Sequence, residues 1–431
     1  MSARRSGAPR TAAVVTIALI PALGLAAVWN WARDEVRSIP VVTVPSVVPG
    51  DGSSVVGVPE VQALSFRRVP TAVIAEVQEQ ESAARLAGVV DSVPEGACLA
   101  VGGQPGIRVE ADGGVNAGAL QRIIVAAAAL EVLGADHRFS TSLHADGLEG
   151  PVIGDLYIIG GGDPMLATSS FADAMRSVPH WWTPVEALAD ALVLLGVERI
   201  AGDVVADGSR YDDDLRPSDW PASVSLTEAG RVDSLVVDRG RLSTSPRNVA
   251  FDPVQAAART LVDLLRARGV VVEGFPRTGT MPPDVPPVAT VRGEPLSRVL
   301  AGMLNTDDAD IAEFVLKEIG VRVSGRGTRI AGVEAIADVV ASWGSAGVAM
   351  TDGSGLGPEN RVSCGALLAA WERARDLLPD GNVPFAAAGD VLGAIDDRPP
   401  VSAVGSASVI ADALRLISEP VDRLSIGELS P

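Results

Sequence analysis

Acyl transfer by a serine needs a hydroxyl and a base in one cavity, and few residues of this chain could supply the base. In one arrangement the hydroxyl stands at a helix N-terminus and a lysine amine follows at i+3, on the same face. The sequence contains one lysine, Lys317, inside the helix-like run IAEFVLKEIG, so the patterns Ser-x-x-Lys and Lys-Thr-Gly are absent. The available imidazole bases are His137, His144 and His180.

A helix near residue 120 would position such a pair. Val115–Gly134 reads VNAGALQRIIVAAAALEVLG. From Leu120 it is dominated by Ala, Leu, Ile and Val, with no Gly or Pro before Gly134, a suitable C′ residue. The run is apolar almost all round, which predicts a helix in the middle of a domain. By itself it indicates no more than a core helix.

Further segments extend this pattern over most of the chain, from about Leu64 to about Leu392. They are AAAALEVLG (126–134), GDLYIIGGGDPML (154–166), RIAGDVVADGSRYDDD (199–214), MLNTDDADIAEFVLKEIG (303–320) and TDGSGLGPENRVS (351–363). In this order they resemble the class C penicillin-binding proteins, the family of D-alanyl-D-alanine carboxypeptidases and endopeptidases. The resemblance implies an α+β fold: a serine β-lactamase/penicillin-binding-protein transpeptidase-like domain with a large, mostly β insertion between the first two catalytic motifs.

The first motif of that family, Ser-x-x-Lys, begins the helix, and both of its reactive residues are replaced here. Alignment on Ala126–Leu130 places Ala119 at the nucleophile and Arg122 at the lysine. A methyl group cannot attack a carbonyl. A guanidinium does not deprotonate in a protein, so Arg122 cannot act as a base. The resemblance therefore points to a degenerate, catalytically silent member.

The second motif, Ser-x-Asn, is also replaced. Ala312-Glu313 keeps the register of the family pattern, so the motif reads Asp307-Asp308-Ala309. We expect the Asp307 carboxylate and the Arg122 guanidinium to form an ion pair that fills the vacated pocket. The alternative is that Asp307 caps a helix and faces solvent.

One hydroxyl is expected near the cleft. Asp352–Leu356 reads DGSGL and matches a loop of the family, which places Ser354 beside the site. The resemblance gives Ser354 a binding role together with Arg122 and Asp307. No histidine belongs to the resembling segments, so we do not expect a Ser–His arrangement to replace the lost pair.

The third motif, Lys-Thr-Gly, has only a weak counterpart. The candidate is Val401–Ser406, which places Val404 where the motif should begin. The 25 residues after Ser406 are fewer than the remaining strands and terminal helix of an ordinary member need. This predicts a sheet truncated at the C-terminus, with an exposed edge that a partner could cover.

Composition and resemblance together divide the chain into parts. The uncharged segment 11–32 is long enough to cross a membrane once, and the basic residues before it are expected on the cytoplasmic side. The segment is either a retained anchor, which leaves the domain extracytoplasmic at the cell membrane, or a cleaved signal peptide, which leaves it secreted. The parts are a leader (1–10), this segment (11–32), an extended linker (33–63), the penicillin-binding-protein-like domain (64–145 and 290–431) and the insertion (146–289).

The insertion should be built mainly from short strands. Its β-like runs are Leu156–Ile159, Arg199–Val205 and Ser234–Val237, followed by a helix over Pro253–Arg268. Two cysteines in an exported chain, Cys98 and Cys364, suggest one disulfide, although two buried thiols that never meet fit the spacing equally well.

The net charge of −19 argues against nucleic acid and against anionic membrane surfaces as partners. We expect no metal ion and no cofactor. The sequence predicts an extracytoplasmic, catalytically inactive homologue of D-Ala-D-Ala carboxypeptidase/endopeptidase that binds peptidoglycan stem peptides or a cell-wall or division protein. The alternative is an active serine-type D-Ala-D-Ala carboxypeptidase whose hydroxyl lies elsewhere, so the sequence leaves enzymatic activity open.

Overall fold

The computed structural model describes residues 90, 93–102, 107–145, 150–176, 181–224, 229–243, 248–345, 347–377, 385–387, 390–393 and 401–404. The predicted leader, the apolar segment 11–32 and the linker 33–63 lie outside these residues. Within the described ranges, no helix is long and apolar enough to cross a membrane.

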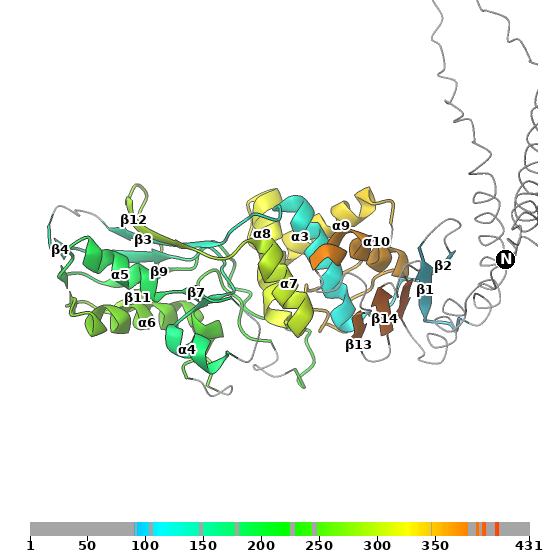
Figure 1. Ribbon diagram of the computed structural model, residues 1–431, viewed down its shortest axis with the longest axis horizontal. Helices are drawn as coiled ribbons and strands as arrows, with labels where there is room; N and C mark the ends of the chain where they lie inside the picture. The colour runs from blue at the N-terminus through cyan, green and yellow to red at the C-terminus, as the bar shows by residue number, and fades with distance from the viewer. Residues whose placement is uncertain are drawn as a thin grey trace, which may run out of the picture. The chain divides into compact units, whose positions relative to one another are not determined.

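Helix α3 (Arg122–Val132) lies at the centre of the first core. It continues the 3-10 turn η1 (Gly118–Gln121), and its residues 122–129 are all buried. A helix that is apolar on every side can be packed on every side. The predicted central helix is thus confirmed. The helices that contact it, shown in Figure 1, are α7 (Leu296–Thr306), α8 (Ala309–Ser324), α9 (Arg329–Ser342) and α10 (Cys364–Ala374).

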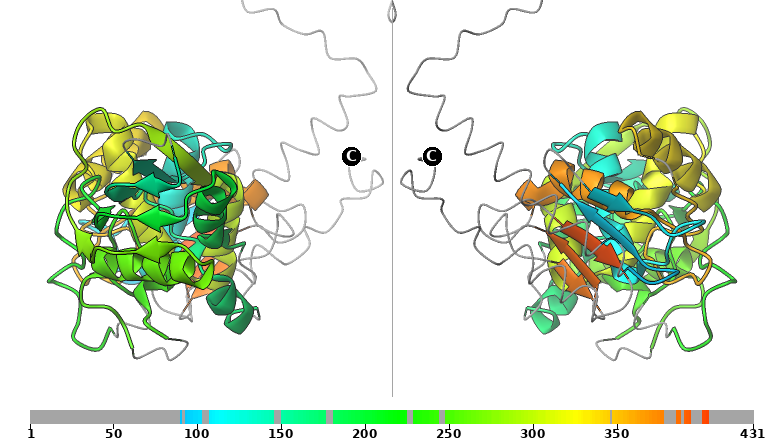
Figure 2. Two further views of the ribbon diagram at one scale, coloured as in Figure 1. Left: turned by 90° about the vertical axis from the view of Figure 1, so that its left-hand side faces the viewer. Right: turned by 90° about the vertical axis from the view of Figure 1, so that its right-hand side faces the viewer.

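Helix α10 lies between α3 and an antiparallel sheet. Cys98 in this sheet and Cys364 at the start of α10 form a disulfide, with their Cα atoms 5.8 Å apart. In Figure 2, right, the blue N-terminal strands lie beside the orange-red C-terminal ones. The order of the described strands is β13 (Phe385–Ala387), β14 (Asp390–Gly393), β15 (Val401–Val404), β1 (Cys98–Val101) and β2 (Ile107–Val109).

The insertion has a second core around a mixed sheet. The strand order is β11-β9-β5-β3-β12, with β9 parallel and β3 antiparallel to both of its neighbours. Side chains of two helices pack on the sheet through Leu188, Leu192, Leu261 and Leu265. The elements are β3 (Ser140–Ala145), β5 (Leu156–Ile159), α5 (Glu186–Leu194), β9 (Val204–Asp207), α6 (Pro253–Ala267), β11 (Pro276–Thr278) and β12 (Pro287–Arg292).

Shorter elements complete the insertion. They are β4 (Val152–Ile153), β6 (Leu166–Ala167), α4 (Ser169–Ala174), β7 (Thr183–Pro184), β8 (Arg199–Ile200), η2 (Asp238–Gly240) and β10 (Val271–Val272), and outside the insertion η3 (Arg375–Leu377) follows α10. Strands β3 and β12 flank the insertion, so its sheet extends a few residues beyond the predicted boundaries 146–289. Helices with antiparallel and mixed sheets form the predicted α+β fold.

The secondary structure predicted for the insertion is partly confirmed. Strand β5 and helix α6 match their predictions, whereas Ser234–Val237 forms no strand. The predicted strand Arg199–Val205 is divided into β8 and β9. Between them the chain turns around Asp155, whose Oδ1 accepts the Asp203 N–H at 2.7 Å.

Candidate functional site

The site lies where η1 leads into α3. Ala119 is half-buried in η1, and Arg122 is the first residue of α3. Only 4% of the Arg122 side chain is exposed, and its Nε donates to the Ser354 carbonyl at 2.8 Å. The structure therefore brings together three of the residues singled out from the sequence: Ala119, Arg122 and Ser354 of the DGSGL loop.

Arg122 Nη1 also donates to a carboxylate oxygen of Asp307. Asp307 ends α7 in the left-handed conformation (φ 56°), and 61% of its side chain is exposed. Asp307 therefore fits both expectations: it forms the ion pair with Arg122, and it is an exposed residue that caps a helix. Because Asp307 is solvated, the pair itself contributes about 0–1 kcal/mol.

The other two residues of the second motif lie in different surroundings. Asp308 caps α8, where its side chain accepts the Ile311 N–H, and it forms an ion pair of 2.6 Å with Arg239 of the insertion. Ala309 is buried in a small apolar cluster that also contains Trp220 and Ala229. Neither residue offers the amide that Ser-x-Asn would present.

The DGSGL loop packs directly on η1. A Cβ at Gly355, which has a φ of +81°, would lie 1.9 Å from the Gly118 carbonyl oxygen, so this approach requires glycine. Ser354 has no exposed surface, and its hydroxyl faces the Leu356 N–H at 3.4 Å. Ser354 therefore lies beside Arg122, but the loop turns its side chain inward, so the hydroxyl expected to bind a ligand has no exposed surface.

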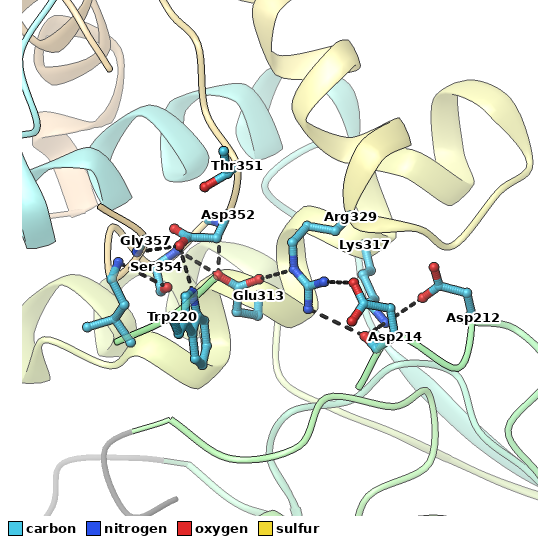
Figure 3. Close-up of polar contacts among 12 residues, drawn as sticks. Asp212, Asp214, Trp220, Glu313, Lys317, Arg329, Thr351, Asp352, Ser354 and Gly357 are labelled. Carbon is cyan, nitrogen blue, oxygen red and sulfur yellow. Dashed lines mark hydrogen bonds and ion pairs between the residues drawn. The ribbon is translucent and has the colours of Figure 1, made fainter. Parts of the chain in front are cut away.

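A buried carboxylate holds the loop in place. Glu313 of α8 accepts the N–H groups of Gly353 and Ser354, both at 2.8 Å, and Arg329 Nε at 3.0 Å (Figure 3). Burial raises the pKa of Glu313. Arg329 in turn donates to the Asp214 carboxylate of the insertion. This chain of charges connects the insertion to the loop.

The single lysine and a second carboxylate also take part in this network. Lys317 is fully buried and donates to Asp212 Oδ1 at 2.7 Å and to the Asp214 carbonyl at 2.8 Å. Asp352 accepts from Trp220 Nε1 at 2.7 Å, as Figure 3 shows, and from the Gly357 N–H at 2.6 Å. The amine of the single lysine in the sequence is therefore engaged in buried structural hydrogen bonds.

Comparison with known proteins decides the family. The sequence matches the D-Ala-D-Ala carboxypeptidase 3 (S13) family over residues 99–250 and 246–378. The chain belongs to this family. The match spans η1, α3, α8 and the DGSGL loop, so the replaced positions of the first two motifs lie inside the matched residues.

Two relatives are similar in sequence. A D-alanyl-D-alanine carboxypeptidase of Actinomadura sp. (strain R39) is 28% identical over an alignment of 329 residues, and the match covers 62% of this chain and 60% of the relative. A carboxypeptidase of Mycobacterium tuberculosis (strain ATCC 25618 / H37Rv) is 27% identical over 260 residues, 59% of this chain and 54% of the relative. The chain thus spans little more than half the length of either relative.

A solved structure supports the fold. The crystal structure of penicillin binding protein 4 from Haemophilus influenzae superposes with a TM-score of 0.60 at 16% identity, and the match covers 76% of this chain and 97% of that one. The same protein in complex with a β-lactam gives a TM-score of 0.52. The class C penicillin-binding-protein resemblance is therefore confirmed at the level of family and fold.

The third-motif prediction at Val404 is wrong. Val404 is buried on β15, an inner strand of the sheet, opposite Cys98 of β1. Among the described strands, β13 at the edge of the sheet contacts η1, which carries Ala119. The predicted truncation of the sheet at the C-terminus was based on the same alignment of Val401–Ser406 with the third motif. The described part contains three strands after residue 384, and residues 405–431 lie outside it.

The histidines do not serve this site in the described part of the chain. His144 Nε2 lies 2.9 Å from Ser142 Oγ, and its Nδ1 lies 2.9 Å from the Val285 carbonyl. This serine–histidine contact is on β3 of the insertion. His137 lies 3.9 Å from Glu318, where burial lowers its pKa. His180 lies outside the described residues.

A separate cavity of about 390 Å³ opens in the insertion. Its lining includes four carboxylates, Asp207, Asp213, Asp233 and Asp252. Burial raises the pKa of Asp233 to about 6. Throughout the described ranges, no group of His, Cys, Asp and Glu side chains has the arrangement to hold a metal ion.

No sequence pattern indicated the roles of Trp220, Asp352 and Arg329. Trp220 and Asp352 are 132 residues apart, and no local pattern connects them. A signal did exist for Glu313, because it kept the register of the family's second motif, but the sequence did not show that it holds the loop.

Proposed function

We propose that this chain is a catalytically inactive member of the S13 family that works outside the cytoplasm by binding peptidoglycan stem peptides. Family membership itself indicates a peptidoglycan-related function. One observation supports the loss of catalysis most directly. Where the nucleophile and its lysine belong, Ala119 presents a methyl, and the Arg122 guanidinium is bound to the Ser354 carbonyl and the Asp307 carboxylate.

This arrangement cannot perform the family's covalent step. An acyl-enzyme ester forms when a serine oxygen attacks the carbonyl and a nearby base takes the hydroxyl proton. Ala119 has no oxygen, and Arg122 stays protonated. Ser354 is buried, and its backbone N–H and carbonyl are both bound, to Glu313 and Arg122. The inherited site therefore supports recognition without acylation.

Export fits the chemistry of the cysteines. The disulfide between Cys98 and Cys364 persists in an oxidising compartment. We propose that residues 11–32 direct this export, as an anchor or as a cleaved signal, because the segment is uncharged and follows a basic leader.

The proposal is tested on the purified exported part by D-alanine release and by peptide binding. A pentapeptide ending in D-Ala-D-Ala is the probe, and the Actinomadura carboxypeptidase is the active control. We expect saturable binding without D-alanine release. Release of D-alanine above the rate without protein would establish the active carboxypeptidase instead. Absence of peptide binding, with capture of a wall-synthesis protein in a pull-down, would replace the peptide by a protein ligand.

A further inference from the structure

Another cavity of the insertion, with a volume of about 340 Å³, opens between helix α6, the turn η2 and helix α4, which lies beside α6 in Figure 1. Its volume is in the range of small-molecule pockets. Helix α6 lines it with residues at i, i+3, i+4 and i+7, and so with a single face: Ala256, Arg259, Thr260 and Asp263. We call it the α6 cavity. Among the described residues that line it, none belongs to the replaced motifs.

The α6 cavity contains charged groups of both signs that the protein leaves unpaired. In the part of the chain that the structure describes, the guanidinium groups of Arg241 and Arg259 and the carboxylate of Asp263 form no hydrogen bond and no ion pair. The other carboxylate of the lining, that of Asp238, accepts the Thr168 N–H at 2.7 Å and its hydroxyl at 2.9 Å. Two cations and one anion of the lining are therefore available to a ligand.

Arg241 is the cation that gains most from a bound anion. It is half-buried, and its guanidinium lies 5.9 Å from the centre of the Phe171 ring. Burial lowers the pKa of Arg241, and the neighbouring charge of Arg239 lowers it further. A carboxylate bound here would be stabilised, because it supplies the opposite charge in place of the water that burial removes.

The turn that places Arg241 is held in a costly conformation. Asp238, Arg239 and Gly240 are all left-handed, with φ of 53°, 54° and 68°. Only glycine adopts this conformation without a steric cost, so the other two residues need contacts that hold them. Asp238 is held by its hydrogen bonds to the N-cap of α4, and Arg239 Nη2 by Asp308 of α8 at 2.6 Å. Backbone strain that the surroundings maintain in this way is typical of ligand sites.

We propose that the α6 cavity is a ligand site for a peptide that carries both a carboxylate and an ammonium group, with the carboxylate bound by Arg241 and Arg259 and the ammonium bound by Asp263. Guanidinium groups recognise planar carboxylates through paired hydrogen bonds. A ligand with negative charge alone, such as phosphate, would be repelled by Asp238 and Asp263. Peptidoglycan stem peptides carry both kinds of group, and this site would bind them independently of the remnant cleft.

The test is calorimetry of the full chain, purified in detergent, with a pentapeptide that ends in D-Ala-D-Ala and has a glutamate and a free lysine side chain. Arg241→Gln and Arg259→Gln should each weaken binding at one site by about tenfold to a hundredfold, through loss of a charge-assisted hydrogen bond. Arg259 is exposed and unpaired in the described part, so its substitution should leave the circular dichroism spectrum unchanged.

The matched control is Arg199→Gln. Arg199 is another half-exposed arginine of the insertion, and it pairs with Glu273 at 3.0 Å on a surface outside the cavity. This substitution removes the same charge and should leave the affinity unchanged. Full binding by both cavity variants, or equal losses in the control, would overturn the proposal.

Acetylation of the peptide amines tests the role of Asp263. Asp263→Asn should weaken binding of the free-amine peptide by about twofold to fivefold, because the carboxylate is exposed, and should leave binding of the acetylated peptide unchanged. Equal effects on the two peptides would contradict the assignment of the ammonium to Asp263.

Hydrogen exchange of the unmodified chain locates the bound peptide. We expect added protection at residues 237–243 and 256–263. Protection confined to residues 353–357 would overturn this proposal and support binding in the remnant cleft. Protection confined to the α6 cavity would support this proposal and contradict the proposed function, so the two failures can be distinguished.

Discussion

Glu313 shows how one residue can determine the geometry of a site without reacting. It is fully buried and joins three donors: two N–H groups of the DGSGL loop and the Arg329 guanidinium. The loop has no regular secondary structure of its own. Its conformation, including the inward turn of Ser354, therefore depends on this carboxylate.

We predict that Glu313→Gln lowers the free energy of unfolding by about 3 kcal/mol, because Arg329 then loses its fully buried ion-pair partner and keeps the half-exposed Asp214. Urea denaturation measures this. Glu334→Gln is the matched control: the Glu334–Arg326 pair is 3.6 Å long with both side chains more than half exposed, so its loss should cost less than about 0.5 kcal/mol. Equal effects of the two substitutions would contradict the account.

Among the elements, α10 depends on contacts at both faces. It lies between α3 and the antiparallel sheet, and Cys364 at its start is bound to Cys98 of β1. The Glu110 carboxylate also accepts the Cys364 and Gly365 N–H groups at 2.9 and 2.8 Å. Helix and sheet are thus connected covalently at the point where the helix begins.

We expect the double substitution Cys98→Ala/Cys364→Ala to lower the free energy of unfolding by about 2–5 kcal/mol, since the bond closes a loop of 266 residues in the unfolded chain. Thermal unfolding followed by circular dichroism checks this. Treatment of the unmodified chain with a reductant in the denatured state should give the same loss. A melting temperature that both changes leave unaltered would show that the bond is dispensable.

Much of the fold could be predicted at the level of helices and strands. The features that could not be predicted have physical reasons. The run after Leu120 is apolar all round, and burial on every side is the only stable solution for such a helix. The third motif could not be placed, because β13 and β15 are both short and apolar and the sequence does not show which is the edge strand. The inward turn of the Ser354 hydroxyl could not be predicted, because a DGSGL pattern does not reveal which way this side chain points.

At the scale of the whole molecule, two hydrophobic cores are joined by charges. Arg210 donates twice to Glu318, at 3.1 and 2.6 Å, and Lys317 donates to Asp212 at 2.7 Å. The chain carries a net charge of −19, and several of its carboxylates are buried. The stability of the molecule should therefore depend on pH well above the usual range of carboxylate titration.

Asp233 allows the direction of one contribution to this pH dependence of the unfolding free energy to be worked out. Burial raises its pKa from 3.8 to about 6, so the folded state holds the proton more tightly than the unfolded state. Its favourable contribution is complete below about pH 4 and is lost as the pH rises to about 6. Asp233→Asn should remove roughly 2–3 kcal/mol of the decrease between pH 4 and pH 7. Unfolding free energies of the variant and the unmodified chain that run parallel across this range would exclude such a titration.

The proposed loss of catalysis depends on two substitutions: Ala119 has no attacking oxygen, and Arg122 replaces the titratable amine of a lysine. Intact-mass spectrometry of residues 33–431 after incubation with a penicillin tests this most directly, with penicillin binding protein 4 from Haemophilus influenzae as the positive control. We predict that the mass of this chain stays unchanged while the control gains one penicilloyl group. A stoichiometric adduct on this chain, mapped to a serine by peptide digestion, would contradict the central claim.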